Sequence, residues 1–217
     1  MENKYLKSRI LHGWPISYDI NIKDLHTRIA NLEDMIKRVT TYAADDTHKM
    51  KMIAILKSNI VTDKEILASL IAEKEANAAL FSAAKTGSSP ETEANIIQKA
   101  ADEIMKASID AARQFDAIVD TLVKSSVYGE ASKEEVSQTL TTATNQSHMA
   151  LSDQGIWRQK GAPTKLFGVE MPEFNPNEAM RTISRVISGN APTLGENSNT
   201  AKNVKPAKEE QAEGPQP

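Results

Sequence analysis

The chain has 217 residues, of which 40% are hydrophobic but only 5% are aromatic. This length allows one or two domains, and so few aromatic residues predict a core of aliphatic and alanine side chains. A net charge of −3 and a pI of about 5.9 argue against a protein whose whole surface binds polyanions. The lack of cysteine excludes disulfides, thiolate nucleophiles and cysteine metal sites.

Residues 1–20 are expected to form an irregular N-terminal arm with at most one short helix, because Trp14-Pro15 argues against a continuous one. The arm lacks the apolar segment of a signal peptide. No stretch of the chain approaches the roughly 20 consecutive apolar residues that a membrane span needs. We therefore expect a cytoplasmic protein without a membrane partner, located in the host cytoplasm or the virion if it is viral.

Two long helices are predicted next, at 22–43 and 47–85. Their hydrophobic residues recur at spacings of three and four, with Asn21 as a candidate N-cap and an acidic break before the second helix. Asp63, Lys74 and Asn77 fall where this stripe expects apolar residues, so they either face solvent past a bend or fix the register of an assembly. The predicted seam residues are Ile29, Leu32, Ile36, Leu56, Ile60 and Leu67.

Residues typical of helix starts and ends then predict two further helices, at 90–127 and 133–152. Gly87 is typical of a helix end, and Ser89 followed by Pro90 is typical of a helix start. Ser132 and Glu135 match a capping box. The seam residues expected here are Ile104, Phe115, Ile118 and Leu122, and removing a fully buried Phe115 ring would cost about 3–5 kcal/mol.

These elements predict an all-α fold in which long helical hairpins, spanning 21–153, form a bundle or a coiled-coil-like assembly. The many helical carboxylates are expected on a solvated face, with no apolar surroundings to raise a pKa. Residues 154–189 should form a Gly/Pro-rich strap and a short helix that begins after Asn175. Residues 190–217 carry no aromatic and almost no aliphatic side chains, so a disordered tail is predicted.

The strap is also a candidate docking peptide, which could lie on its own bundle or in the groove of a neighbour. Its docking residues are Trp157, Leu166, Phe167 and Phe174. Basic residues near aromatic ones, in the arm and in the strap, are candidate polyanion contacts, although packed aromatics with ordinary surface cations are the favoured interpretation. These cations are Lys4, Lys7, Arg9, Arg158, Lys160 and Lys165.

Catalytic, metal-binding and phosphate-binding motifs are absent from the sequence. The four histidines are far apart and lack the spacing that places two ligands on one helical face. Phosphate-loop, dinucleotide-binding and nucleophile-elbow patterns do not occur. We therefore expect a non-enzymatic protein without a metal, a cofactor or a small-molecule substrate.

The stretch from Ala43 to Leu67, AADDTHKMKMIAILKSNIVTDKEIL, joins one helix to a longer one through a short acidic break. With its flanks, over residues 21–85, it resembles the central oligomerisation hairpin of small terminase subunits of tailed phages. In that family the hairpins build a ring, flanking segments contact DNA and the large subunit, and the ATPase and nuclease belong to the large subunit. The 20-residue arm, however, is too short for a helix-turn-helix domain.

The sequence therefore favours a helical oligomeric assembly protein that binds further copies of itself. The resemblance implies a phage DNA-packaging subunit, with DNA or a phage protein as a further partner. The acidic pI favours two alternatives without a nucleic-acid role. These are a virion-interior structural or scaffold protein and a helical adaptor.

Overall fold

A computed structural model describes residues 2–13, 15–42, 45–159, 165–166, 169–170 and 173–190. Within these residues the fold is helical, as predicted, apart from one antiparallel pair of two-residue strands in the strap. The predicted tail beyond Asn190 lies outside the described residues. The elements are α1 (Glu2–His12), α2 (Pro15–Tyr42), α3 (Asp46–Thr86), α4 (Pro90–Lys124), α5 (Lys133–Asp153), β1 (Lys165–Leu166), β2 (Val169–Glu170) and α6 (Pro176–Ile187).

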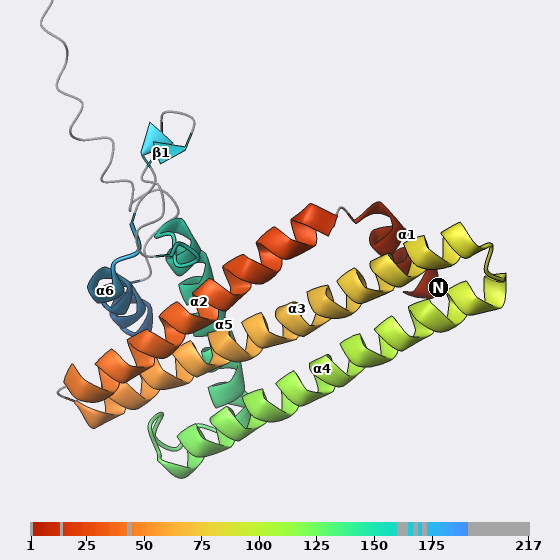
Figure 1. Cartoon of the computed structure of the whole chain (residues 1–217). Coiled ribbons are helices and arrows are strands. Elements are labelled where there is room, and N and C mark those ends of the chain that lie inside the picture. The colour runs from red at the N-terminus through yellow and green to blue at the C-terminus, as the bar shows by residue number, and fades with distance from the viewer. Residues whose placement is uncertain are drawn as a thin grey trace, which may run out of the picture.

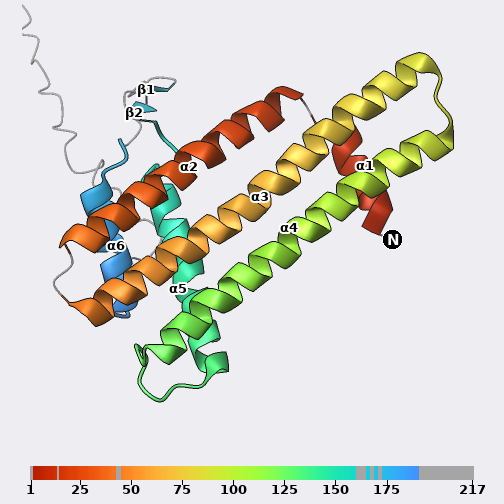
Figure 2. The same cartoon turned by 60° about the horizontal axis from the view of Figure 1, so that its bottom comes forward.

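The helices form two layers. The long helix α3 lies in the middle of the first layer, with α2 along one side and α4 along the other (Figure 1). Helices α1, α5 and α6 lie behind this layer, and α5 crosses it at a steep angle (Figure 2). The second layer therefore covers α3 and α4 at both ends and leaves their middle open between α1 and α5.

Local side-chain chemistry sets several helix ends where the sequence predicts them. The Asp45 carboxylate accepts hydrogen bonds from the first turn of α3, and Gly87 ends that helix with a φ of 67°. Ser89 caps α4 ahead of Pro90. Ser132 and Glu135 form the expected capping box at the start of α5, and Asn175 caps α6.

The prediction of an irregular N-terminal arm is wrong. Residues of this segment form α1 and the first turns of α2, which begins at Pro15 rather than near residue 22. Proline suits the first position of a helix, where its missing N–H would have no partner, so Pro15 starts a helix as well as ending one. Asn21 consequently lies inside α2 and is not its cap. Gly13 permits the tight turn, since a Cβ there would overlap the Tyr18 ring.

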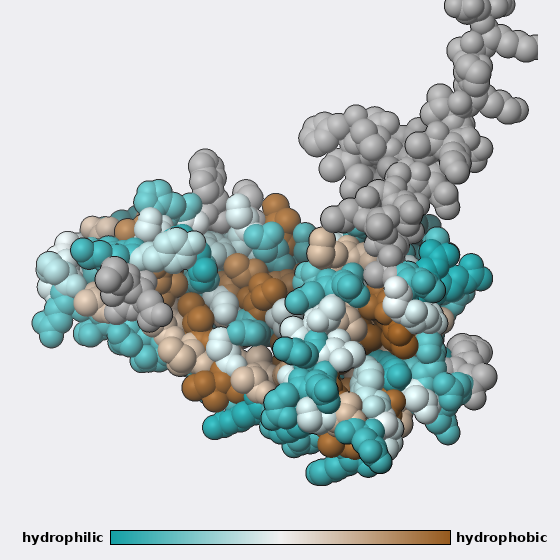
Figure 3. Space-filling model, turned by 180° about the vertical axis from the view of Figure 1, so that it is seen from behind, coloured by the Kyte–Doolittle hydropathy of each residue, from teal (hydrophilic) through white to brown (hydrophobic). Residues whose placement is uncertain are grey.

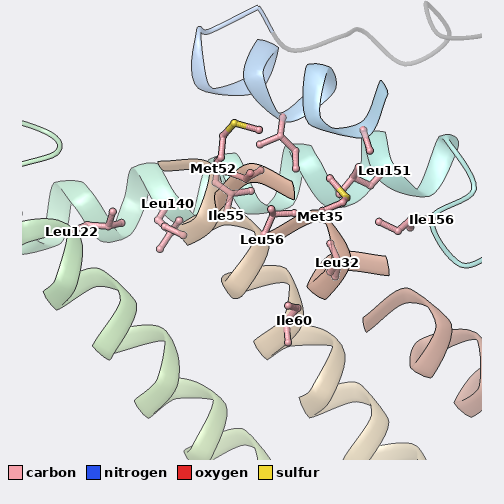
Figure 4. Close-up of a cluster of buried hydrophobic side chains, with 14 of the residues drawn as sticks. Leu32, Met35, Met52, Ile55, Leu56, Ile60, Leu122, Leu140, Leu151 and Ile156 are labelled. Atoms are coloured by element: carbon pink, nitrogen blue, oxygen red, sulfur yellow. The ribbon is translucent and has the colours of Figure 1, made fainter. Parts of the chain in front are cut away.

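The main hydrophobic core lies where α5 and α6 cross α2 and α3 (Figure 4). Five predicted seam residues are buried there, namely Ile29, Leu32, Leu56, Ile60 and Leu122. Four others pack only at its edge, namely Ile36, Leu67, Phe115 and Ile118. Ile104 is half-exposed and belongs to neither core cluster.

A second, smaller core holds α1 against the far ends of α3 and α4. It is made of Ile10, Ala76, Leu80, Ile97 and Ala100. The alanines let the helices approach closely, which is the role that the alanine-rich stretches of the sequence suggest. The two cores leave the central part of the α3–α4 hairpin without a second layer.

Candidate functional site: a buried polar centre and an exposed apolar patch

A buried polar centre joins α2, α3 and α5. The Nε atom of Arg28 lies 2.7 Å from Oδ2 of Asp63, whose side chain is 0% exposed. On the α5 side, Nη2 of Arg28 donates to Nδ1 of His148 at 2.6 Å, and Nη1 donates to the Ser152 hydroxyl at 3.4 Å. One guanidinium therefore contacts a carboxylate on α3 and two side chains on α5.

A second polar contact lies one turn away in the same core. The Asn59 amide donates to the Ser147 hydroxyl at 2.9 Å, and Ser147 in turn donates to the backbone carbonyl of Thr144. Both side chains are buried. This contact favours the observed orientation of α5 on α3, because another orientation would cost the buried Asn59 amide its hydrogen bond to Ser147, and Asn59 Oδ1 already has no partner among the described residues.

Burial dominates the electrostatics of Asp63. It raises the pKa of Asp63 to about 6, and the opposing attraction of Arg28 offsets this only in part. The 2.7 Å contact is an ion pair rather than an aligned hydrogen bond, so both carboxylate oxygens lack a hydrogen-bond partner among the described residues. The expectation that no helical carboxylate has a raised pKa is therefore wrong, because α5 lies across α3 and excludes water from this position.

His148 is held in its neutral form by its contacts. The Arg28 guanidinium can only donate, so Nδ1 of His148 must accept and cannot carry a proton. Burial, followed by the charge of Arg28, lowers the pKa of His148. The contribution of His148 to stability is therefore present above the pKa of the unfolded histidine, and it is lost as the pH falls through the lower pKa of the folded state.

Asp63 has the opposite pH dependence. Because its pKa is higher in the folded than in the unfolded state, its contribution to stability is complete below about pH 4 and is lost as the pH rises through 6. We expect the Asp63 carboxyl carbon to titrate by NMR with a midpoint near 6. In Arg28→Met the midpoint should rise further, since the attraction that lowers it is removed. A midpoint near 4 in the unaltered chain would mean that water reaches this carboxylate.

The predicted polyanion contacts are dispersed over the molecule. Lys7 and Arg9 on α1 form ion pairs with Glu93 and Glu73, so much of their positive charge is already balanced. Lys4 is exposed on α1, whereas Arg158 follows α5, and α1 and α5 do not contact each other (Figure 1). Lys165 belongs to β1, and Lys160 lies outside the described residues. Among those that the structure describes, Lys4, Lys7 and Arg9 on α1 therefore do not share one basic surface with Arg158.

The candidate docking residues of the strap that the structure describes do not lie together on one surface element. Trp157 and Phe174 are partly buried and pack against the main core of their own chain. Leu166 belongs to β1, while Phe167 lies outside the described residues. The two aromatic side chains that the structure describes therefore pack in cis.

An exposed apolar patch lies in the opening between α1 and α5. It consists of Ile66 on α3 with Met105 and Ile109 on α4, whose exposed fractions are 41%, 60% and 46%. A hydrogen bond from Ser108 to Glu65 fixes the two helices side by side at this level. Figure 3 views the molecule from this side and shows hydrophobic surface in its middle. We call these three residues the α3–α4 patch.

The sequence contains a pattern that indicates this patch, although the predicted seam residues do not include it. Met105, Ile109 and Ala112 repeat at spacings of four and three, beside the stripe that contains Ile104. Helix α4 thus has two apolar stripes, and only the structure shows that the second one lacks a neighbouring helix. Large aliphatic side chains that are exposed side by side mark an interaction surface more often than scattered ones do.

The chemistry open to these two sites differs. Arg28 and Asp63 are both buried, so a substrate in solution cannot reach the ion pair between them. No group of three or more potential metal ligands occurs within the described residues. None of the described helices is long and apolar enough to cross a membrane. The α3–α4 patch is accordingly the stronger candidate for an interaction with another molecule.

Comparisons with protein-family models, with curated proteins and with solved structures give no match to this chain.

Proposed function

We propose that this chain is a non-enzymatic helical assembly protein that associates with further copies of itself. The observation that carries the proposal is the α3–α4 patch, in which three large aliphatic side chains face water in the middle of a long helical hairpin. Burying them against another protein surface would gain roughly 25 cal/mol for each Å² of apolar surface removed from water. A symmetric assembly achieves this burial with no second gene product.

The polar centre supports this proposal as a structural element. It fixes α5 on α2 and α3, and this placement leaves the opening in which the patch lies. Buried polar contacts of this kind are best attested as devices that select one register. The centre would thus position the patch, not perform chemistry.

A narrower form of the proposal is a phage DNA-packaging subunit similar to small terminase subunits. It rests on the resemblance of the α2–α3 hairpin to the oligomerisation hairpin of that family. The alternative is a virion-interior structural or scaffold protein, or a helical adaptor, with no nucleic-acid role. The ion pairs of Lys7 and Arg9 favour this alternative, because they leave less free positive charge on α1.

A DNA-binding assay separates these two forms. Binding to duplex DNA that weakens steeply with added salt would support the packaging subunit, since phosphate contacts release counterions. The absence of binding at low salt would favour the structural protein or adaptor. Either result is independent of whether the chain associates with itself.

Self-association is tested by charging the patch. We expect Met105→Glu combined with Ile109→Glu to lower the native mass to that of a monomer, measured by light scattering after size exclusion, because burying two carboxylates in an apolar contact is unfavourable. Gln114→Glu is a matched control, since it places a carboxylate at an exposed α4 position outside the patch. An unaltered chain that is monomeric at high concentration would refute the proposal.

A further inference from the structure

The geometry of α4 points to a specific contact between two copies, in which the α4 helices pack antiparallel across a two-fold axis that crosses α4 between residues 107 and 108. This inference rests on the proposed function, because it names the surface through which the assembly forms. It commits the α3–α4 patch to one occupant, a second copy of the same chain.

Helix α4 lies at an edge of the first layer. It packs against α3, and contacts between α4 and α2 are absent among the described elements. Near its start, Ile97 and Ala100 pack with α1, and near its end Asp116 and Asp120 form ion pairs with Lys133 at the start of α5. The stretch from 102 to 113 lies between these contacts, and it carries both Met105 and Ile109.

The charges on this stretch are complementary to themselves in an antiparallel pair. Asp102, Lys106, Asp110 and Arg113 are all exposed, and Arg113 also lies 3.7 Å from Asp110 on its own helix, with both side chains still open to water. An axis midway between residues 107 and 108 pairs positions that lie equally far on either side of it. Asp102 of one copy then lies opposite Arg113 of the other, and Lys106 lies opposite Asp110 to within one residue. A two-fold axis there would place each charge opposite one of the other sign, and each such pair would occur twice.

The same axis brings the apolar side chains together. Met105 of one copy would meet Ile109 of the other, again to within one residue, so that the contact has an apolar centre between charged flanks. A parallel pairing in register would instead place Asp102 beside Asp102 and Arg113 beside Arg113. Like charges directly opposite each other are unfavourable, so the charge pattern selects the antiparallel orientation.

A charge-swap experiment tests this contact. One chain carries Arg113→Glu and another carries Asp102→Lys, and both are full-length. In each variant alone, the paired positions would have like charges, and we expect the dimer to dissociate about tenfold more readily than the unaltered one. In an equimolar mixture both pairs regain opposite charges, so native mass spectrometry should show mainly the mixed dimer.

The two positions provide an internal control. Residues 102 and 113 are about 16 Å apart along one helix, so the swap cannot restore a direct contact within a single chain. Circular dichroism of each variant checks that the exposed substitutions leave the helices intact. Lys106→Glu and Asp110→Lys form a second pair, which should behave in the same way if either variant of the first is poorly folded.

The outcomes separate this inference from the proposed function. If the unaltered chain is monomeric, self-association and the α4 contact are both wrong. If the unaltered chain associates, but both variants associate equally well and mix at random, the chain self-assembles through another surface and the α4 contact alone is overturned. Preferential mixed dimers would establish the antiparallel contact.

Discussion

Replacing Arg28 by methionine is expected to lower the free energy of unfolding by about 3–5 kcal/mol, because it leaves the carboxylate of Asp63 buried without a counter-charge. The contacts of Arg28 with His148 and Ser152 on α5 are lost in the same substitution. Urea denaturation at pH 7, where Asp63 is mainly ionised in the unaltered protein, measures the effect. The loss should shrink at pH 5, since Asp63 is then mostly protonated and has less need of a partner.

Removing both charges should reverse this loss. In Arg28→Met combined with Asp63→Leu, two apolar side chains replace a pair whose burial costs more than its attraction returns, as the raised pKa of Asp63 indicates. We expect a protein at least as stable as the unaltered one, with a gain of about 1–4 kcal/mol if the new side chains pack well. The ion pair of Arg28 and Asp63 would then determine where α5 packs, and it would contribute little to the free energy of unfolding.

The exposed pair between Asp34 and Arg38 is the matched control for these variants. It has the same residue types and the same 2.7 Å separation, but it lies on the surface of α2. Arg38→Met should cost no more than about 1 kcal/mol. If Arg28→Met were as mild as Arg38→Met, the polar centre would have to be open to water.

The sequence predicts those parts of the fold that neighbouring residues determine. The acidic break, which supplies Asp45 as the cap of α3, the end of that helix at Gly87 and the capping box at Ser132 all satisfy backbone groups within one turn of chain. Pro15 shows the limit of such local signals. The same residue can end one helix or begin the next, and the packing of Ile10 against α3 and α4 is what selects a second helix here.

The two candidate sites could not be predicted because they depend on contacts between distant segments. Asp63 is a polar residue within the apolar stripe of α3. Met105 is an apolar residue that lies beside the predicted apolar stripe of α4. The crossing of α5 buries the first, and the distance between α1 and α5 leaves the second exposed. A residue's spacing defines the face of the helix it occupies, whereas the arrangement of the other helices decides what covers that face.

What covers a helix face also predicts which of two core substitutions costs more stability. Leu56 is fully buried where α2, α3 and α5 meet, and Leu56→Ala should lower the free energy of unfolding by about 2–5 kcal/mol through lost burial and the cavity that remains. Phe115 is only partly buried at the edge of this core, so Phe115→Ala should cost less than the 3–5 kcal/mol expected for a buried ring. Chemical denaturation of both variants gives the comparison. If Phe115→Ala lowered the free energy of unfolding by more than Leu56→Ala does, the hydrophobic centre would lie in the contact between α3 and α4. The exposure of Ile66, Met105 and Ile109 on that same hairpin argues against this outcome.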